Sequence, residues 1–186
     1  MTASGTETEI KIPVSELESL RSRLLGAGAV EKRAGHDEDN TLYDDAGGRL
    51  SHSGCALRLR VAGGRGIVTF KGPATFTGNV KSRMELQTGL DDPETFRAIL
   101  GRLGFVPRFR YQKRRQELEF MDCTVCLDET PIGCFVEVEG EAGEISEALR
   151  QLGLSAEDAV RDSYAGLYAR ARQKDSSLPP DMLFSR

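Results

Sequence analysis

The chain has 186 residues, 39% of them hydrophobic and 29% charged, and a formal net charge of −4. This length fits one domain, the apolar content excludes a disordered body, and the net charge argues against a nucleic-acid partner bound through bulk positive charge. No apolar run approaches the roughly 20 residues that cross a bilayer, and residues 1–9 lack the apolar core of a signal peptide, so we predict a cytoplasmic protein without a membrane partner.

The first half of the chain is typical of strands separated by turns. Residues 6–12 alternate charged with apolar side chains, which predicts a strand, and leucines at helical spacing over residues 17–25 predict a helix that ends at Gly26. A glycine-rich turn at residues 63–66 predicts a hairpin between the strands that flank it. Four further strands are expected in this half, over residues 36–44, 56–61, 66–71 and 78–88.

The second half adds helices to the strands. Asp91, Asp92 and Pro93 indicate the start of a helix that Gly104 closes. The remaining elements are expected to be strands over residues 105–116, 118–128 and 134–140, and helices near residues 145–152 and 156–171. We therefore expect one domain over residues 6–172. The C-terminal tail, residues 173–186, contains an apolar group at residues 182–184 that we expect to dock on the body.

Nearly every predicted strand carries long charged side chains on one face and apolar ones on the other. A solvated outer face explains any one such strand, but their repetition favours a sheet that closes around its charged faces. The expected fold class is therefore α+β, a closed antiparallel eight-stranded β-barrel with helices packed outside. Two sets of residues would line its interior: the bases Lys11, Arg58, Arg60, Lys71, Lys81, Arg83, Lys113 and Arg115, and the acids Glu7, Glu9, Glu85, Asp128, Glu137 and Glu139.

So many inward charges need partners, because a buried charge is costly unless it is paired or binds an ion. The excess of bases suits a polyanion, and arginine matches the geometry of phosphate oxygens. The carboxylates suit Mg²⁺ or Mn²⁺, which prefer oxygen ligands. A bound triphosphate with its divalent metal accounts for both signs of charge in one cavity.

The cysteines and histidines carry no comparable pattern. Cys123 and Cys126 have CxxC spacing, but residues three apart in a strand point to opposite faces, so we expect free thiols. His36 and His52 each stand alone, and we expect structural or surface roles for both.

The charged motifs resemble those of the CYTH superfamily, the triphosphate tunnel metalloenzymes. Residues 7–11 fit the ExExK signature, and the resemblance extends to Tyr168. Gln87 departs from the family pattern, in which many relatives carry a second acid after Glu85. Residues 162–164, Asp-Ser-Tyr, resemble the class IV adenylyl cyclase branch. The other landmarks in family order are Tyr43-Asp44, Arg58 and Arg60, residues 69–73, Arg83 and Glu85, Lys113 and Arg115, Leu127-Asp128, and Glu137 and Glu139.

This resemblance implies a role for each charged residue. Lys11, Lys71 and Asp128 would take part in catalysis, Asp128 by orienting a base or a second metal. The phosphates would be held by Lys11, Arg58, Arg60, Lys71, Lys81, Arg83, Lys113 and Arg115. The metal, Mg²⁺ or Mn²⁺, would be held by Glu7, Glu9, Glu85, Glu137 and Glu139.

Three activities fit these residues. The resemblance favours a class IV adenylyl cyclase-like enzyme, which converts ATP to cyclic AMP and pyrophosphate. The first alternative is a triphosphatase acting on tripolyphosphate or thiamine triphosphate, and the second is a non-catalytic polyphosphate-binding module. No segment indicates an adenine pocket. A homodimer, if one forms, would use helices or loops, because a closed barrel leaves few free strand edges.

Overall fold

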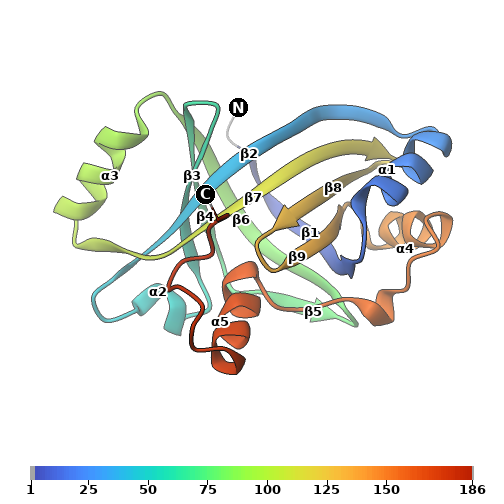
Figure 1. Cartoon of the computed structure of the whole chain (residues 1–186). Coiled ribbons are helices and arrows are strands. Elements are labelled where there is room, and N and C mark those ends of the chain that lie inside the picture. The colour runs from blue at the N-terminus through green and yellow to red at the C-terminus, as the bar shows by residue number, and fades with distance from the viewer. Residues whose placement is uncertain (1–2, 186) are drawn as a thin grey trace.

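The computed structural model describes residues 3–185, and a closed β-barrel dominates it (Figure 1). Eight strands follow one another around the barrel in the order β1, β9, β8, β7, β2, β3, β4, β6, and β6 pairs with β1 to close the ring. Every pairing is antiparallel, and β5 pairs with β6 outside the ring. The expected fold class is confirmed. The strands are β1 (Ala3–Val14), β2 (Val30–Asp45), β3 (Ala56–Ala62), β4 (Arg65–Lys71), β5 (Thr75–Thr77), β6 (Val80–Leu90), β7 (Phe105–Phe120), β8 (Cys123–Thr130) and β9 (Gly133–Glu139).

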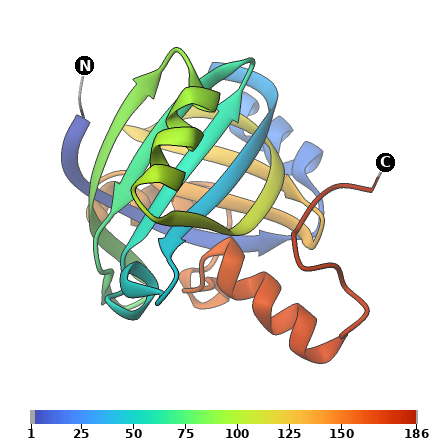
Figure 2. The same cartoon turned by 90° about the vertical axis from the view of Figure 1, so that its left-hand side faces the viewer.

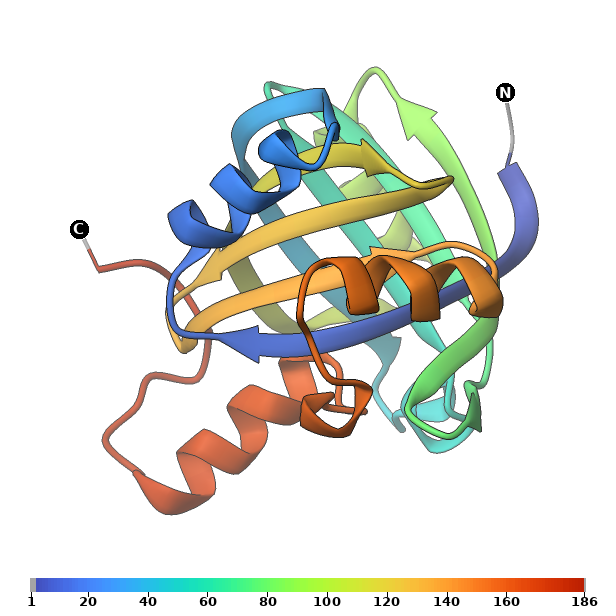
Figure 3. The same cartoon turned by 90° about the vertical axis from the view of Figure 1, so that its right-hand side faces the viewer.

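Helices pack against the outside of the barrel. Two of them, α1 and α4, lie over β1, β8 and β9 (Figure 3), where Leu24 and Ile145 are buried in one core with Ile10, Val125 and Val138. Burying one such side chain contributes about 1.5–3 kcal/mol. The outward apolar faces of these strands are therefore covered. The helices are α1 (Leu17–Gly26), α2 (Arg49–His52), α3 (Pro93–Arg102), α4 (Ala142–Gln151), the 3-10 helix η1 (Ala156–Asp158) and α5 (Tyr164–Lys174).

The other faces have smaller cores. On the side of β3 and β4, α3 packs across the strands (Figure 2), with Leu100 buried beside Leu59 and Tyr43. On α5, Tyr164 and Tyr168 belong to an aromatic cluster that covers the start of β7 and β9. Because the apolar side chains of the strands point outward under α1, α3 and α4, the alternating side chains point into the barrel. The cluster at α5 differs, because it includes Tyr111, which faces the barrel interior.

The hairpin between β7 and β8 lies further along the chain than predicted. The strand expected over residues 118–128 was wrong at its start, because β7 continues to Phe120 and β8 begins at Cys123. Leu118 and Phe120 are buried and continue the outward apolar alternation of β7. The turn is made by Met121 and Asp122, both with left-handed φ angles, 53° and 59°.

The helix predicted over residues 156–171 was also wrong in extent. The chain forms only η1 there, continues without helix, and enters α5 at Tyr164. The backbone N–H of Val160 donates to the carbonyl oxygen of Lys11 at 2.8 Å, which keeps this linker along β1. The Ser163 hydroxyl then caps α5 by accepting a hydrogen bond from Gly166 N at 3.2 Å. Neither α2 nor β5 was expected.

The C-terminal tail docks on the barrel through Met182, which is fully buried. Its backbone N–H donates to Arg110 O at 3.0 Å and its carbonyl oxygen accepts from Gln112 N at 2.9 Å. The Tyr168 hydroxyl donates to Asp181 O at 3.1 Å. Because α5 extends to Lys174, the helix crosses the boundary expected at residue 172, and the division into domain and tail stays a prediction.

The two ends of the barrel have different connections. At one end lie the β3–β4 and β7–β8 turns, at residues 63–64 and 121–122, and we call it the hairpin end. At the other end β2 passes through α2 into β3, close to the start of α5 (Figures 1 and 2), and we call it the α2–α5 end. None of the helices in residues 3–185 has the length and hydropathy needed to cross a membrane.

Candidate active site

A cavity of about 1080 Å³ occupies the inside of the barrel. All eight predicted bases line it, together with five of the six predicted acids: Glu7, Glu9, Glu85, Glu137 and Glu139. Gln87, the departure from the family pattern, lines it as well. Contrary to expectation, Asp128 is fully buried and is not part of the cavity wall.

The pairing of β1 with β6 brings acids and bases face to face on one wall. Glu7 lies opposite Arg83 in the register, and Glu9 lies opposite Lys81, with which it forms an ion pair. Lys71 Nζ lies 2.8 Å from Glu7 Oε2 and 2.6 Å from Glu85 Oε2. These lysines are therefore held at the cavity wall by carboxylates of neighbouring strands.

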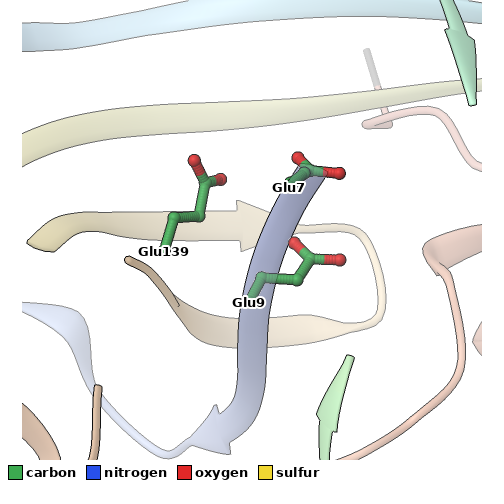
Figure 4. A group of neighbouring side chains, drawn as sticks. All are labelled: Glu7, Glu9 and Glu139. Atoms are coloured by element: carbon green, nitrogen blue, oxygen red, sulfur yellow. The ribbon is translucent and has the colours of Figure 1, made fainter. Parts of the chain in front are cut away.

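Three carboxylates gather where β1 meets β9. One oxygen from each of Glu7, Glu9 and Glu139 lies within 4.8 Å of the others (Figure 4). Burial, together with the nearby charges of Glu137, Glu9 and Glu7, raises the pKa of Glu139 to about 7, against the effect of Arg115. Crowded carboxylates of this kind fit a hard divalent cation, which takes oxygen ligands. The donor set therefore suits Mg²⁺ or Mn²⁺.

The other two predicted metal ligands lie outside this cluster. Glu137 Oε1 is 3.1 Å from Lys11 Nζ, and its second oxygen pairs with Arg115. Although burial raises the pKa of Glu137, Lys11 and Arg115 lower it well below its usual range. Glu85 pairs with Lys71. The metal-ligand roles of Glu85 and Glu137 stay predictions, and in the structure both side chains bind bases.

Asp128 is the centre of a buried hydrogen-bond network. Arg115 donates to it from Nε at 2.7 Å and Nη2 at 2.6 Å, Lys113 donates from Nζ at 3.0 Å, and the Tyr164 hydroxyl donates at 2.7 Å. The ring of Tyr164 also lies under Lys11, with Nζ 4.0 Å from its centroid. Because its oxygens already accept four hydrogen bonds, Asp128 fits a positioning residue for Lys113 and Arg115. Its predicted catalytic role stays a prediction.

The match to a known family covers most of this barrel. Residues 5–164 match the family model of the CYTH domain. The chain belongs to the CYTH family. Because the matched residues run from the first barrel strand to Tyr164, they include every charged residue of the tunnel described above.

Relatives of this CYTH protein cover nearly its whole length. A Methanocaldococcus jannaschii protein named "putative adenylate cyclase" is 27% identical over 176 residues, which span 87% of this chain and 97% of the relative. A Vibrio parahaemolyticus structure of the same name has a TM-score of 0.78 at 18% identity, covering 90% and 99% of the two chains. A Hippeastrum structure has a TM-score of 0.63 at 19% identity, covering 95% and 99%. The two structures share the fold.

Three residues in or next to the CYTH tunnel were not among the predicted site residues. Glu38 on β2 is completely buried, with Oε1 2.8 Å from Arg60 Nη1. Burial raises its pKa, but Lys113 and Arg60 together lower it to about 2. Tyr111 and Tyr164 line the cavity. A charged side chain within the strand predicted over residues 36–44 was a usable signal for Glu38, whereas the position of Tyr164 depends on a helix packed against the barrel.

The CxxC residues diverge as expected. Cys126 lines the tunnel, whereas Cys123 is buried in the outer core under α1 and α4. Both are free thiols, as are Cys55 and Cys134. His36 Nδ1 donates a hydrogen bond to Ala34 O at 3.0 Å and lies beside Glu38, which fits the structural role expected of it.

Proposed function

We propose that this CYTH protein is a metal-dependent enzyme that acts on a triphosphate in its tunnel, and that the reaction is the cyclisation of ATP to cyclic AMP and pyrophosphate. One observation carries the proposal: a cluster of three carboxylates, Glu7, Glu9 and Glu139, faces the same closed cavity as eight basic side chains. The relative from M. jannaschii named "putative adenylate cyclase" supports the cyclase reading.

The carboxylate cluster would hold the cation. Mg²⁺ or Mn²⁺ bound by Glu7, Glu9 and Glu139 would neutralise charge on phosphate oxygens and lower the pKa of the attacking hydroxyl. Lys71 and Lys81 lie beside the same cluster, since they pair with Glu7 and Glu9. The lysines and the cation would therefore bind neighbouring phosphate oxygens.

The basic wall would position the phosphates. Lys113 and Arg115 are oriented by Asp128, so their donors are fixed before substrate binds. In the cyclase reaction the ribose 3′-hydroxyl attacks the α-phosphorus, the bond to the β-phosphate oxygen breaks, and pyrophosphate leaves. The negative charge that develops on the leaving pyrophosphate would be stabilised by these fixed bases and by Arg58, which is buried in the same wall.

Hydrolysis of the terminal phosphate is the second candidate. The Hippeastrum structure is described as a putative adenylyl cyclase with a dominant triphosphatase activity, and it shares this fold. The same bases and carboxylates would serve attack by water on the terminal phosphorus. The substrate would then be tripolyphosphate or another triphosphate, and the products would include orthophosphate.

Product analysis tests the proposal. The pure protein is incubated separately with ATP and with tripolyphosphate, each with Mg²⁺ or Mn²⁺, and the products are separated by chromatography. Cyclic AMP with an equal amount of pyrophosphate supports the cyclase. Release of orthophosphate from tripolyphosphate, with ATP unchanged, would show that the protein is a triphosphatase and not a cyclase. Binding of both compounds without any product would leave a polyphosphate-binding module.

A further inference from the structure

Tyr164, the first residue of α5, contacts three charged residues of the barrel interior at once. Its ring lies under Lys11, with Nζ 4.0 Å from the ring centroid, and Lys113 Nζ is 5.3 Å from the same centroid. Its hydroxyl donates to Asp128 Oδ2 at 2.7 Å. The side chain is buried and lines the cavity. Packing a helix on the barrel requires apolar surface, but it does not require contacts of this kind.

The segment that leads into α5 holds the same lysine. Lys11 Nζ donates to Asp162 O at 3.3 Å, and the Val160 N–H donates to Lys11 O at 2.8 Å. The ammonium also pairs with Glu137 Oε1 at 3.1 Å. Residues 160–164 therefore contact both the backbone and the side-chain end of Lys11, although they lie at the other end of the chain.

Without these contacts the Lys11 side chain would have alternative positions. Glu9 lies two residues earlier on the same strand and also lines the cavity. Although burial lowers the pKa of Lys11, the charges of Glu137 and Glu9 raise it overall, so both carboxylates attract the ammonium. A lysine side chain is flexible, and it loses conformational entropy when a ligand orders it. The contact with the Tyr164 ring limits this freedom before any ligand binds.

We propose that Tyr164 is a positioning residue that holds the ammonium of Lys11, and more weakly that of Lys113, where the triphosphate binds. This inference rests on the triphosphate binding of the proposed function and adds a residue that acts through these lysines. The negative face of an aromatic ring attracts a cation. The hydrogen bond to Asp128 fixes the orientation of the ring. Burial and the charges of Glu137 and Asp128 raise the pKa of Tyr164 well above its usual range, so the hydroxyl keeps the proton that it donates.

Tyr168, one turn further along α5, provides a comparison within the same helix. It is buried in the same aromatic cluster as Tyr164. Its hydroxyl contacts the carbonyl oxygens of Pro179 and Asp181 in the tail, at 2.9 and 3.1 Å. The cavity lining described for residues 3–185 does not include it. Tyr168 is therefore a matched control that shares the packing of Tyr164 but not its place in the tunnel.

The first test compares Tyr164→Leu with Tyr168→Leu. Calorimetry without divalent metal gives the Kd of tripolyphosphate, and urea denaturation gives the stability of each variant. Both variants should lose stability, because each removes an aromatic side chain from one buried cluster. Tyr164→Leu should also weaken tripolyphosphate binding about tenfold, which corresponds to about 1.4 kcal/mol. Tyr168→Leu should change this Kd less than about twofold, because it shares no partner with the lysines.

The second test changes the charge on the ring face and keeps the shape of the ring. Tyr164→Phe retains the ring, so it should rescue most of the binding that Tyr164→Leu loses. Monofluoro-, difluoro- and trifluorophenylalanine are then introduced at position 164, because each fluorine withdraws charge from the ring face. Tripolyphosphate binding should weaken stepwise, by about fivefold over the series. A ring that only filled space would give no such trend.

A third variant, Lys11→Met, identifies the residue through which Tyr164 acts. It removes the ammonium and keeps an unbranched side chain. In this background Tyr164→Leu should weaken tripolyphosphate binding by less than about threefold, because its main contact is already gone and only the weaker contact with Lys113 remains. Losses that multiply fully in the double variant would overturn the inference. Equal losses of binding in the two leucine variants, or no trend along the fluorine series, would overturn it as well.

Measurements on the unaltered protein separate this inference from the proposed function. If the unaltered protein binds tripolyphosphate and Tyr164→Leu binds it equally well, the triphosphate tunnel stands and Tyr164 only packs α5 on the barrel. Binding of neither tripolyphosphate nor ATP by the unaltered protein would refute the proposed function and the inference together.

Discussion

The carboxylates on two sides of the tunnel differ in how closely basic side chains contact them. On the Asp128 side, formed by Asp128, Lys113, Arg115 and Tyr164, the carboxylate accepts hydrogen bonds from three other side chains. On the Glu139 side, three carboxylates face one another, and the nearest base to Glu139 is Arg115 Nη1 at 3.9 Å. The first side is complete without a ligand. On the second side Glu7 and Glu9 pair with Lys71 and Lys81, so Glu139 is the carboxylate whose charge a cation would relieve.

The largest effect is expected from Asp128→Ala. This change leaves Lys113 and Arg115 buried without their shared carboxylate, and breaking a buried pair costs about 3–5 kcal/mol. Urea denaturation should therefore show a loss of several kcal/mol in the free energy of unfolding. The neighbouring Glu129→Ala is the matched control, because its pair with Arg114 is exposed and should contribute less than about 1 kcal/mol. Similar losses in both variants would show that the Asp128 network is no stronger than a surface pair.

A smaller effect on stability and a large one on turnover are expected from Glu9→Ala. Removing one of three clustered carboxylates should reduce turnover by about a hundredfold or more, while tripolyphosphate binding is largely kept because the bases remain. Calorimetry should also show weaker binding of Mg²⁺ or Mn²⁺.

Glu119→Ala is the control for this change, since Glu119 is exposed on β7 and pairs with Lys32. It should leave turnover and metal binding unchanged. If Glu9→Ala abolished tripolyphosphate binding, and no turnover had been seen in the unaltered protein, a sensing role would replace the enzyme.

Alternation within a strand was enough to predict which residues face inward. Glu9 and Lys11 point into the barrel because their apolar neighbours Ile10 and Ile12 point to the outer core. Which acids meet which bases was not readable in the same way. Glu139 joins Glu7 and Glu9 whereas Glu137 binds Lys11, and this depends on the register between β1 and β9.

Contacts between distant elements explain the remaining failures. Asp128 was expected in the lining, but Tyr164 reaches it from α5, and no local pattern gives the packing of that helix. The end of β7 was misjudged because Leu118 and Phe120, which were assigned to the next strand, continue its alternation. Local periodicity predicts on which face of a strand a side chain lies, whereas tertiary packing determines which side chains pair with one another.

The weak pairing of Glu139 should also make the stability of the fold depend on pH. In metal-free protein, folded Glu139 has a pKa of about 7, well above the usual range of a glutamate. Between pH 4.5 and 7 the folded state therefore binds a proton that the unfolded state lacks, and stability falls as the pH rises. Glu139→Gln removes this titration. Its free energy of unfolding at pH 8 should exceed that of the unaltered protein by on the order of 1–2 kcal/mol, and the gain should vanish near pH 4.5.

Glu38→Gln should change stability in the opposite direction, although Glu38 is also a glutamate beside bases that line the tunnel. The pKa of Glu38 is about 2, so its ionised form stabilises the fold above about pH 4.5, and this contribution is lost as the pH falls toward 2. At pH 8 the glutamine variant should therefore be less stable, because Arg60 and Lys113 lose a buried partner. Chemical denaturation of both variants at pH 8 and pH 4.5 measures the contrast. If both glutamine variants were less stable than the unaltered protein at pH 8, Glu139 would be as well paired as Glu38. The electrostatic argument for a cation at Glu139 would then fail.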